Sequence, residues 1–69
     1  MSPTTTGVRA ARTEAGLRQA DLAATVGVSR QTIIALERGD YSPSVYLALR
    51  IARALEHTVE ELFPLSEEE

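Results

Sequence analysis

The apolar positions along the chain recur at helical spacing, and few of them alternate with polar positions as they would in a half-buried strand. The strongest apolar stripe lies in the second half of the chain and consists of Val45, Leu47, Ala48, Ile51, Ala52 and Leu55. This pattern predicts an all-α domain of five short helices. The expected helical ranges are residues 8–15, 19–26, 30–38, 43–55 and 59–63.

Capping residues mark where these helices begin and end. A glycine, the residue that most easily adopts a left-handed conformation, follows each of the first three helices: Gly16, Gly27 and Gly39. The expected N-caps of the third, fourth and fifth helices are Ser29, Ser42 and Thr58. Pro43 would then take the first position of the fourth helix, and Glu61 would complete a capping box with Thr58.

The second and third predicted helices have the pattern of a helix-turn-helix, in which two helices cross steeply through a short turn. Ala23 is small where the helices must approach closely, and Gly27 can adopt the positive φ that the turn requires. The positions that would bury the elbow are all apolar: Leu22, Val26, Val28, Ile33 and Leu36. Because these requirements are met together at the right spacing, we interpret residues 19–38 as a helix-turn-helix, a motif that binds DNA.

The chain of 69 residues is long enough for one small domain. It contains no cysteine, so it forms no disulfide and offers no thiolate to a metal; this fits a reducing cytosol, and we expect a cytoplasmic protein. No stretch approaches the roughly 20 apolar residues of a membrane span, and residues 1–7 lack the pattern of a signal peptide. Stability must therefore come from packed helices or from a partner subunit.

The net charge of −3 by itself argues against nucleic-acid binding, but the charge is unevenly distributed. Residues 1–43 contain five arginines and four acidic residues, a balance of +1, whereas residues 44–69 contain two arginines and six acidic residues, a balance of −4. Every basic residue is arginine, which suits bidentate contacts with phosphate and guanine. The first part of the chain can therefore present a locally positive face.

Candidate catalytic and metal-binding groups are scarce. His57 is the single histidine, and without a cysteine or a second histidine it makes a poor metal ligand, so a surface or dimer-edge role is expected. Catalysis needs a nucleophile beside a base, a carboxylate pair in a cleft or a metal cluster, and so short a chain leaves little room for any of these. We therefore expect no enzymatic activity, no metal and no cofactor.

The stretch from residue 16 to residue 52 reads GLRQADLAATVGVSRQTIIALERGDYSPSVYLALRIA. It resembles the core of the Cro and phage-repressor family, also called the xenobiotic-response-element family, and in particular its smallest bacterial members, which have no second domain. The resemblance covers residues 8–63 and implies a five-helix, lambda-repressor-like domain that docks its third helix in the major groove of double-stranded DNA. It also implies a homodimer that binds a palindromic operator, most often as a repressor.

The resemblance also assigns roles to residues. The first turn of the recognition helix, which reads base edges, consists of Ser29, Arg30, Gln31 and Thr32. Gln19 would contact phosphate and can support that helix. Ile34 departs from the family pattern, which often has a small or polar exposed residue there, and it would touch a thymine methyl group. The segment that grips the DNA backbone consists of Arg38, Tyr41, Ser42 and Ser44. Arg12 and Glu37 would form a structural ion pair, and Glu56 replaces a glycine that is frequent in the family.

The C-terminal half is expected to form the dimer, because the last helix has more apolar surface than so short a helix can bury. The residues expected at this interface are Tyr46, Leu62, Phe63 and Leu65; for Tyr46 and Leu65, simple exposure is an equal alternative. Residues 1–7 are predicted to form a flexible arm. Residues 64–69 are predicted to form an acidic tail that is solvated or repelled by DNA.

Two alternatives keep the same fold but change the function. The chain could be the antitoxin of a toxin–antitoxin pair, which binds a toxin-like protein and regulates its own operon, or it could be a protein-interaction module. Either alternative predicts an exposed apolar patch away from the recognition helix.

Overall fold

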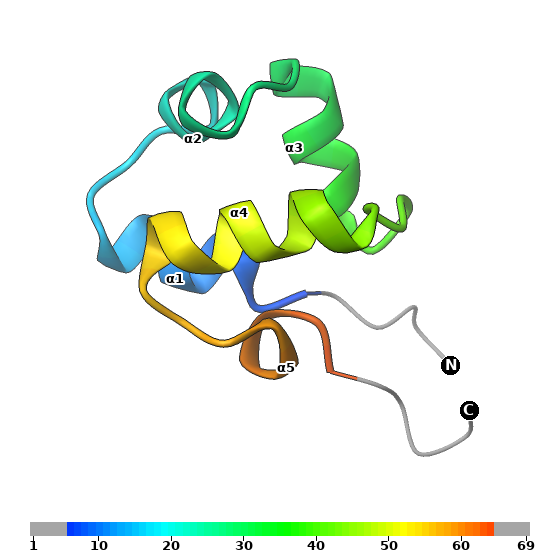
Figure 1. Ribbon diagram of the computed structural model, residues 1–69. Coiled ribbons are helices and arrows are strands. Elements are labelled where there is room, and N and C mark those ends of the chain that lie inside the picture. The colour runs from blue at the N-terminus through cyan, green and yellow to red at the C-terminus, as the bar shows by residue number, and fades with distance from the viewer. Residues whose placement is uncertain (1–5, 65–69) are drawn as a thin grey trace.

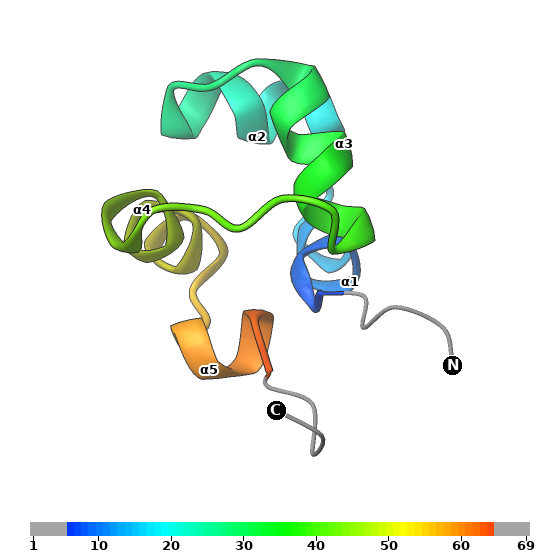
Figure 2. The ribbon, with the colours of Figure 1, turned by 90° about the vertical axis from the view of Figure 1, so that its right-hand side faces the viewer.

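The computed structural model describes residues 6–64, which form five α-helices and no strand (Figure 1). The helices are α1 (Val8–Glu14), α2 (Gln19–Val26), α3 (Arg30–Arg38), α4 (Val45–Leu55) and α5 (Val59–Leu62). α4 crosses the bundle and packs against α2 on one side and α5 on the other, as the two views show (Figures 1 and 2). The predicted all-α fold of five helices is confirmed.

A turn of three residues joins α2 to α3. Gly27 ends α2 in the left-handed conformation with a φ of +80°, which a residue with a Cβ rarely adopts. The backbone N–H groups of Gly27 and Val28 both donate to the carbonyl oxygen of Ala23, so the end of α2 is closed by hydrogen bonds. α3 leaves this turn steeply, since Figure 1 shows α2 end-on and α3 along its length. The predicted helix-turn-helix is therefore present.

One hydrophobic core receives side chains from all five helices. The largest side chains that are fully buried are Leu22, Ile33, Leu36, Ile51, Leu62 and Val8. Burying one such side chain stabilises the fold by about 1.5–3 kcal/mol relative to leaving it exposed. Ala23 is 4% exposed, as expected for a small residue on the tightly packed side of α2. The core thus fixes the position of α3 through its buried side chains, Ile33 and Leu36.

The start of α4 differs from the prediction. Its N-cap is Ser44, whose hydroxyl oxygen accepts a hydrogen bond from the backbone N–H of Leu47 at 3.1 Å, so Pro43 precedes the helix. The prediction of Ser42 as N-cap is wrong because serines flank Pro43 on both sides and the second one caps the helix. Val45 was predicted to point inward, but it lies on the solvent side of the first turn and is 73% exposed.

α4 ends at Glu56, which adopts the left-handed conformation with a φ of +58°. Within residues 6–64 it is the single residue other than glycine with a positive φ. For a side chain with a Cβ this conformation costs about 1–2 kcal/mol. The replacement of a frequent glycine by Glu56 therefore leaves the turn in place and strains its backbone.

The two ends of the described chain lie side by side. The backbone N–H of Gly7 donates to the carbonyl oxygen of Leu62 at 2.7 Å, and a Cβ on Gly7 would lie 2.8 Å from the carbonyl oxygen of Glu61. The prediction that the flexible arm extends to residue 7 is therefore wrong, because Gly7 is held against α5. Residues 1–5 of the predicted arm and residues 65–69 of the predicted tail lie outside the described residues.

The capping box predicted for α5 is present. The backbone N–H of Glu61 donates to the hydroxyl of Thr58 at 3.2 Å, and the backbone N–H of Thr58 donates to the carboxylate of Glu61 at 2.8 Å. The N–H of Thr58 and the adjacent His57 side chain lower the pKa of Glu61. In the described part of the chain, no helix is long and apolar enough to cross a membrane. The same residues contain no cluster of three His, Cys, Asp or Glu side chains that could hold a metal ion.

Candidate nucleic-acid interface

α3 exposes one face along its whole length. Ile33, Leu36 and Glu37 are buried beneath it, whereas Arg30, Gln31 and Arg38 are exposed and Ile34 and Ala35 are partly exposed. The exposed residues recur at spacings of one, three and four positions, which places them on one side of the helix. The outward face therefore has polar residues at its first turn, two apolar residues in the middle and an arginine at its end.

The first turn of α3 is closed by its cap. The Ser29 hydroxyl accepts a hydrogen bond from the backbone N–H of Thr32 at 3.1 Å, and the hydroxyl groups of Ser29 and Thr32 lie 2.9 Å apart. Both side chains thus stabilise the end of the helix. Arg30 and Gln31 lie between them in the sequence, and their side chains have no hydrogen bond within residues 6–64. Of the four residues predicted to read bases, these two are the freest to reach a ligand.

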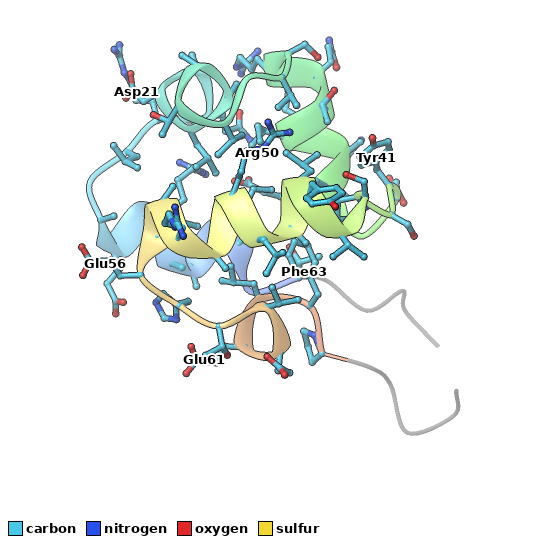
Figure 3. All side chains as sticks on the ribbon, in the orientation of Figure 1. Asp21, Tyr41, Arg50, Glu56, Glu61 and Phe63 are labelled. Carbon is cyan, nitrogen blue, oxygen red and sulfur yellow. The ribbon has the colours of Figure 1, made fainter. Side chains whose placement is uncertain are left out.

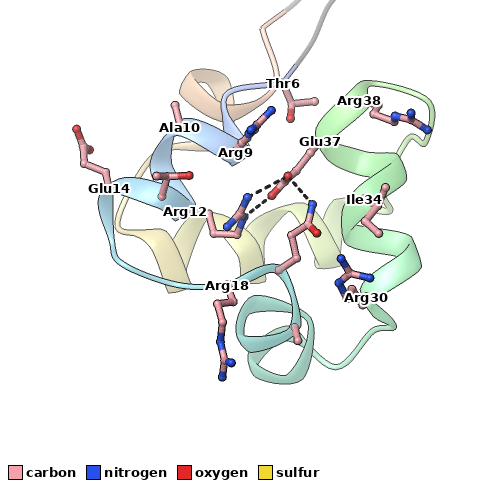
Figure 4. Close-up of a pocket in the computed structure, with 13 residues that line it drawn as sticks. Thr6, Arg9, Ala10, Arg12, Glu14, Arg18, Arg30, Ile34, Glu37 and Arg38 are labelled. Atoms are coloured by element: carbon pink, nitrogen blue, oxygen red, sulfur yellow. Dashed lines mark hydrogen bonds and ion pairs between the residues drawn. The ribbon is translucent and has the colours of Figure 1, made fainter.

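An open groove lies between α1, the start of α2 and the exposed face of α3 (Figure 4). The arginines that line it are Arg9, Arg12, Arg18, Arg30 and Arg38, and the acidic residues that line it are Glu14 and Glu37. The lining residues therefore have a net charge of +3 in a chain whose net charge is −3. A concave surface of positive charge concentrates anions such as phosphate.

A buried ion pair forms the floor of this groove. The Arg12 Nε atom lies 2.5 Å from the Glu37 Oε2 atom, and the exposed fractions of the two side chains are 11% and 5%. Arg12 donates a second hydrogen bond to the Glu37 Oε1 atom at 3.3 Å and a third to the carbonyl oxygen of Leu17 at 2.8 Å. The predicted ion pair is present, and it ties α1 to both α3 and the segment that leads into α2.

Gln19 joins the same network. Its Nε2 atom donates to the Glu37 Oε1 atom at 3.1 Å, so the first residue of α2 is fixed to the last turn of α3 (Figure 4). This bond matches the supporting role expected of Gln19. With Arg12 and Gln19 both bound to Glu37, one carboxylate sets the positions of α1, α2 and α3 relative to one another.

Arg18 forms an exposed ion pair at the start of α2. Its Nε atom lies 3.1 Å from the Asp21 Oδ2 atom, and its side chain is 84% exposed. Hydrogen bonds from the Arg18 side chain and backbone lower the pKa of Asp21. An exposed pair of this kind contributes little to stability, so Arg18 can exchange Asp21 for another anion at low cost.

The predicted backbone-gripping loop follows α3. Tyr41 is 44% exposed and Ser42 is exposed, so both can be contacted from outside. The hydroxyl of Ser44 is engaged as the N-cap of α4, an 11-residue helix whose N-terminal N–H groups face the loop. The positive end of that helix dipole favours an anion at this position.

The residues predicted at a dimer interface have different environments. Leu62 is 1% exposed within a single chain, so its assignment to the interface is wrong: the core already buries it. Phe63 is partly buried against the same core, and Tyr46 is 78% exposed. Leu65 lies outside the described residues.

Three residues of the site were not predicted from the sequence. Arg9 and Arg18 line the groove, and Ala35 lies on the exposed face of α3. Helical spacing alone could have identified Ala35, which lies one turn after Gln31. No local signal identifies Arg9, because its role depends on the packing of α1 beside α3.

The structure is that of a DNA-binding helix-turn-helix domain. Two of its helices cross through a tight turn, the second of them exposes a polar face, and a positive groove lies beside that face. The chain belongs to the helix-turn-helix family of the Cro and phage-repressor type, whose pattern it matches over residues 8–62. It is accordingly a DNA-binding transcriptional regulator.

Three similar proteins match this chain over most of their own length. An uncharacterized HTH-type transcriptional regulator from Methanothermobacter thermautotrophicus is 60% identical over 63 residues, which are 88% of this chain and 90% of the relative. The P22 c2 repressor, solved with a synthetic operator, is 33% identical with a TM-score of 0.78, over 83% of this chain and 86% of that one. The restriction-modification controller protein C.AhdI from Aeromonas hydrophila is 38% identical with a TM-score of 0.73, over 81% and 85% of the two chains.

Proposed function

We propose that this regulator is a repressor that binds a palindromic operator as a homodimer and reads its sequence with the exposed face of α3. The observation that carries the proposal is the position of Arg30, which is exposed at the first turn of α3 and lines the positive groove. The first turn of a recognition helix is the part that enters the major groove. The similarity of this chain to the P22 c2 repressor and to the controller protein C.AhdI supports the same mode of action.

Base reading is assigned to the free side chains of α3. Arg30 bonds the O6 and N7 atoms of a guanine, and Gln31 bonds an adjacent adenine or orients Arg30. Ile34 contacts a thymine methyl group, to which Ala35 adds a second small apolar surface. Ser29 and Thr32 contribute by holding the first turn in shape, with their hydroxyls as secondary contacts.

Phosphate contacts are assigned to the rim of the same face. Arg38 and Gln19 both line the groove, and Tyr41, Ser42 and Ser44 extend the contact toward the start of α4. To these we add Arg9 and Arg18, which line the groove and whose exposed guanidinium groups can each take one phosphate. Phosphate contacts hold the protein in register without reading sequence.

Two variants distinguish contacts with the bases from contacts with the phosphates. Arg30→Ala should weaken binding to a selected operator by about 1–3 kcal/mol and relax the preference at one base pair of each half-site. Arg38→Ala should weaken binding to operator and scrambled DNA by the same factor. Both affinities are measured for each variant by fluorescence anisotropy. If Arg30→Ala lowers both affinities equally, Arg30 contacts only the backbone and the assignment of base reading is wrong.

A two-fold homodimer would place its two recognition helices about 34 Å apart, which is one turn of DNA and matches the two halves of a palindromic operator. Exposed Tyr46 and partly buried Phe63 are the described residues that we assign to the interface, together with Leu65. Sedimentation that shows only monomer at tens of micromolar, with and without operator, would contradict this.

We also propose that the protein acts in the cytoplasm. Val45, Tyr46 and Leu49 on α4 form an exposed apolar patch of the kind that the antitoxin and protein-interaction alternatives predict, but neither the family nor its relatives support the antitoxin alternative.

A further inference from the structure

The proposed homodimer needs more apolar surface than α5 can supply. α5 is four residues long, and its largest inward side chain, Leu62, is already buried in the core of one chain. A specific dimer commonly buries about 800 Å² on each partner. Most of that surface must therefore come from another part of the molecule.

The exposed face of α4 supplies it. Val45, Tyr46 and Leu49 are 73%, 78% and 51% exposed, and a shallow groove runs along the face between Tyr46, Leu49, Arg50 and Arg53. Figure 3 shows Arg50 projecting from this helix. α4 lies in front of α1 in Figure 1 and behind α1 in Figure 4, and no residue that lines this shallow groove also lines the arginine-lined groove.

The charge of this face limits what can cover it. Neither Arg50 nor Arg53 forms an ion pair with another residue in the range 6–64. A two-fold interface brings the same patch of both subunits together. Packing the face on its own copy would bring together two arginines from each subunit and no carboxylate, so the charge favours an occupant that is both apolar and acidic.

One segment of this chain has that chemistry. Residues 65–69 read Leu-Ser-Glu-Glu-Glu, one apolar residue followed by three carboxylates, and they follow α5 directly after Pro64. Five residues span at most about 17 Å when extended. That length is close to the shorter dimensions of the molecule, 22 Å, and sufficient to follow two turns or more of a neighbouring helix.

We infer that the homodimer is held by reciprocal exchange of this tail, with residues 65–69 of each subunit lying on the α4 face of the other. Leu65 packs between Tyr46 and Leu49 of the second copy, and the glutamates pair with its Arg50 and Arg53. The arrangement obeys two-fold symmetry without opposing like charges. It rests on the proposed homodimer and explains how a short α5 can support one.

The test is a charge reversal on each side of the contact, measured by analytical ultracentrifugation of the full chain. Arg50→Glu with Arg53→Glu should raise the dimer dissociation constant about tenfold or more, and so should Glu67→Arg with Glu68→Arg and Glu69→Arg. Combining the two sets in one chain should restore dimerisation to near the wild-type value. Glu56→Gln with Glu60→Gln, which alters exposed acids outside the contact, is the control and should leave the constant unchanged. Circular dichroism of each variant checks the fold.

The outcomes separate this inference from the homodimer itself. A wild-type dimer that neither reversal weakens, or that the combined variant fails to restore, overturns the tail exchange and leaves the homodimer standing. A tail that binds the α4 face of its own chain gives the same unchanged constant and likewise overturns the exchange. A wild-type protein that is monomeric at every concentration, with and without operator, overturns both.

Discussion

Replacing Glu37 by alanine should destabilise the domain more than any other single change in the groove. The Glu37 side chain is 5% exposed and its partner Arg12 is 11% exposed, so the substitution leaves a guanidinium group buried without its carboxylate. Breaking such a pair costs about 3–5 kcal/mol. A domain of 69 residues has a total stability of roughly 3–10 kcal/mol, so Glu37→Ala should be partly unfolded at 37 °C.

Urea denaturation followed by far-ultraviolet circular dichroism measures this loss. The control Glu14→Ala removes an exposed acid from the same groove and should change stability by less than about 0.5 kcal/mol. The double variant Arg12→Met with Glu37→Leu removes both charges and should be more stable than Glu37→Ala alone. If Glu37→Ala lies within 1 kcal/mol of wild type, or the double variant is the least stable, the account of the ion pair is wrong.

Three further predictions concern the ends of the helices. Ser44→Ala should cost about 1 kcal/mol of unfolding free energy and Ser42→Ala almost none, because only Ser44 caps α4; equal losses in urea titrations would place the helix start elsewhere. Glu56→Gly should raise the thermal midpoint, because glycine removes a strain of about 1–2 kcal/mol at φ +58°, and an unchanged or lower midpoint would argue against that strain. The pKa of Glu61 is lowered in the fold, so its contribution to stability is present above the ordinary value of 4.5 and is lost as pH falls through the lower folded value. Glu61→Gln should flatten this part of the stability profile, which is measured by denaturation at several pH values.

The helix-turn-helix could be predicted because its requirements are local. Gly27 ends α2 with a positive φ, Ala23 is buried where a small residue was required, and Ser29 caps α3. Gly27 and Ser29 are each fixed by the conformation of two or three consecutive residues, and Ala23 is fixed by the close contact between two helices that are neighbours in the sequence. Local chemistry was ambiguous at the start of α4, where two serines flank Pro43 and the chain uses the second.

Features that depend on packing between distant segments could not be predicted in this way. The burial of Leu62 follows from where α5 lies against the core, and the exposure of Val45 follows from the rotation of α4 at its first turn. The role of Arg9 arises because α1 packs beside α3 and turns that side chain into the groove. The ion pair of Arg12 with Glu37 was expected from the resemblance to a family, whereas its link to Gln19 required the structure.

The exposed face of α3 and its arginine-lined groove are expected to bind DNA in a sequence-specific way. The most direct measurement selects operators from a random DNA pool and then compares the affinity for a selected and a scrambled duplex at several salt concentrations. Binding to the selected duplex should be at least about a thousandfold tighter than to the scrambled one. The log–log salt slope should be near −7 for a dimer with about eight phosphate contacts. Equal affinities for the two duplexes, together with a slope indistinguishable from zero, would contradict sequence-specific DNA binding by this face.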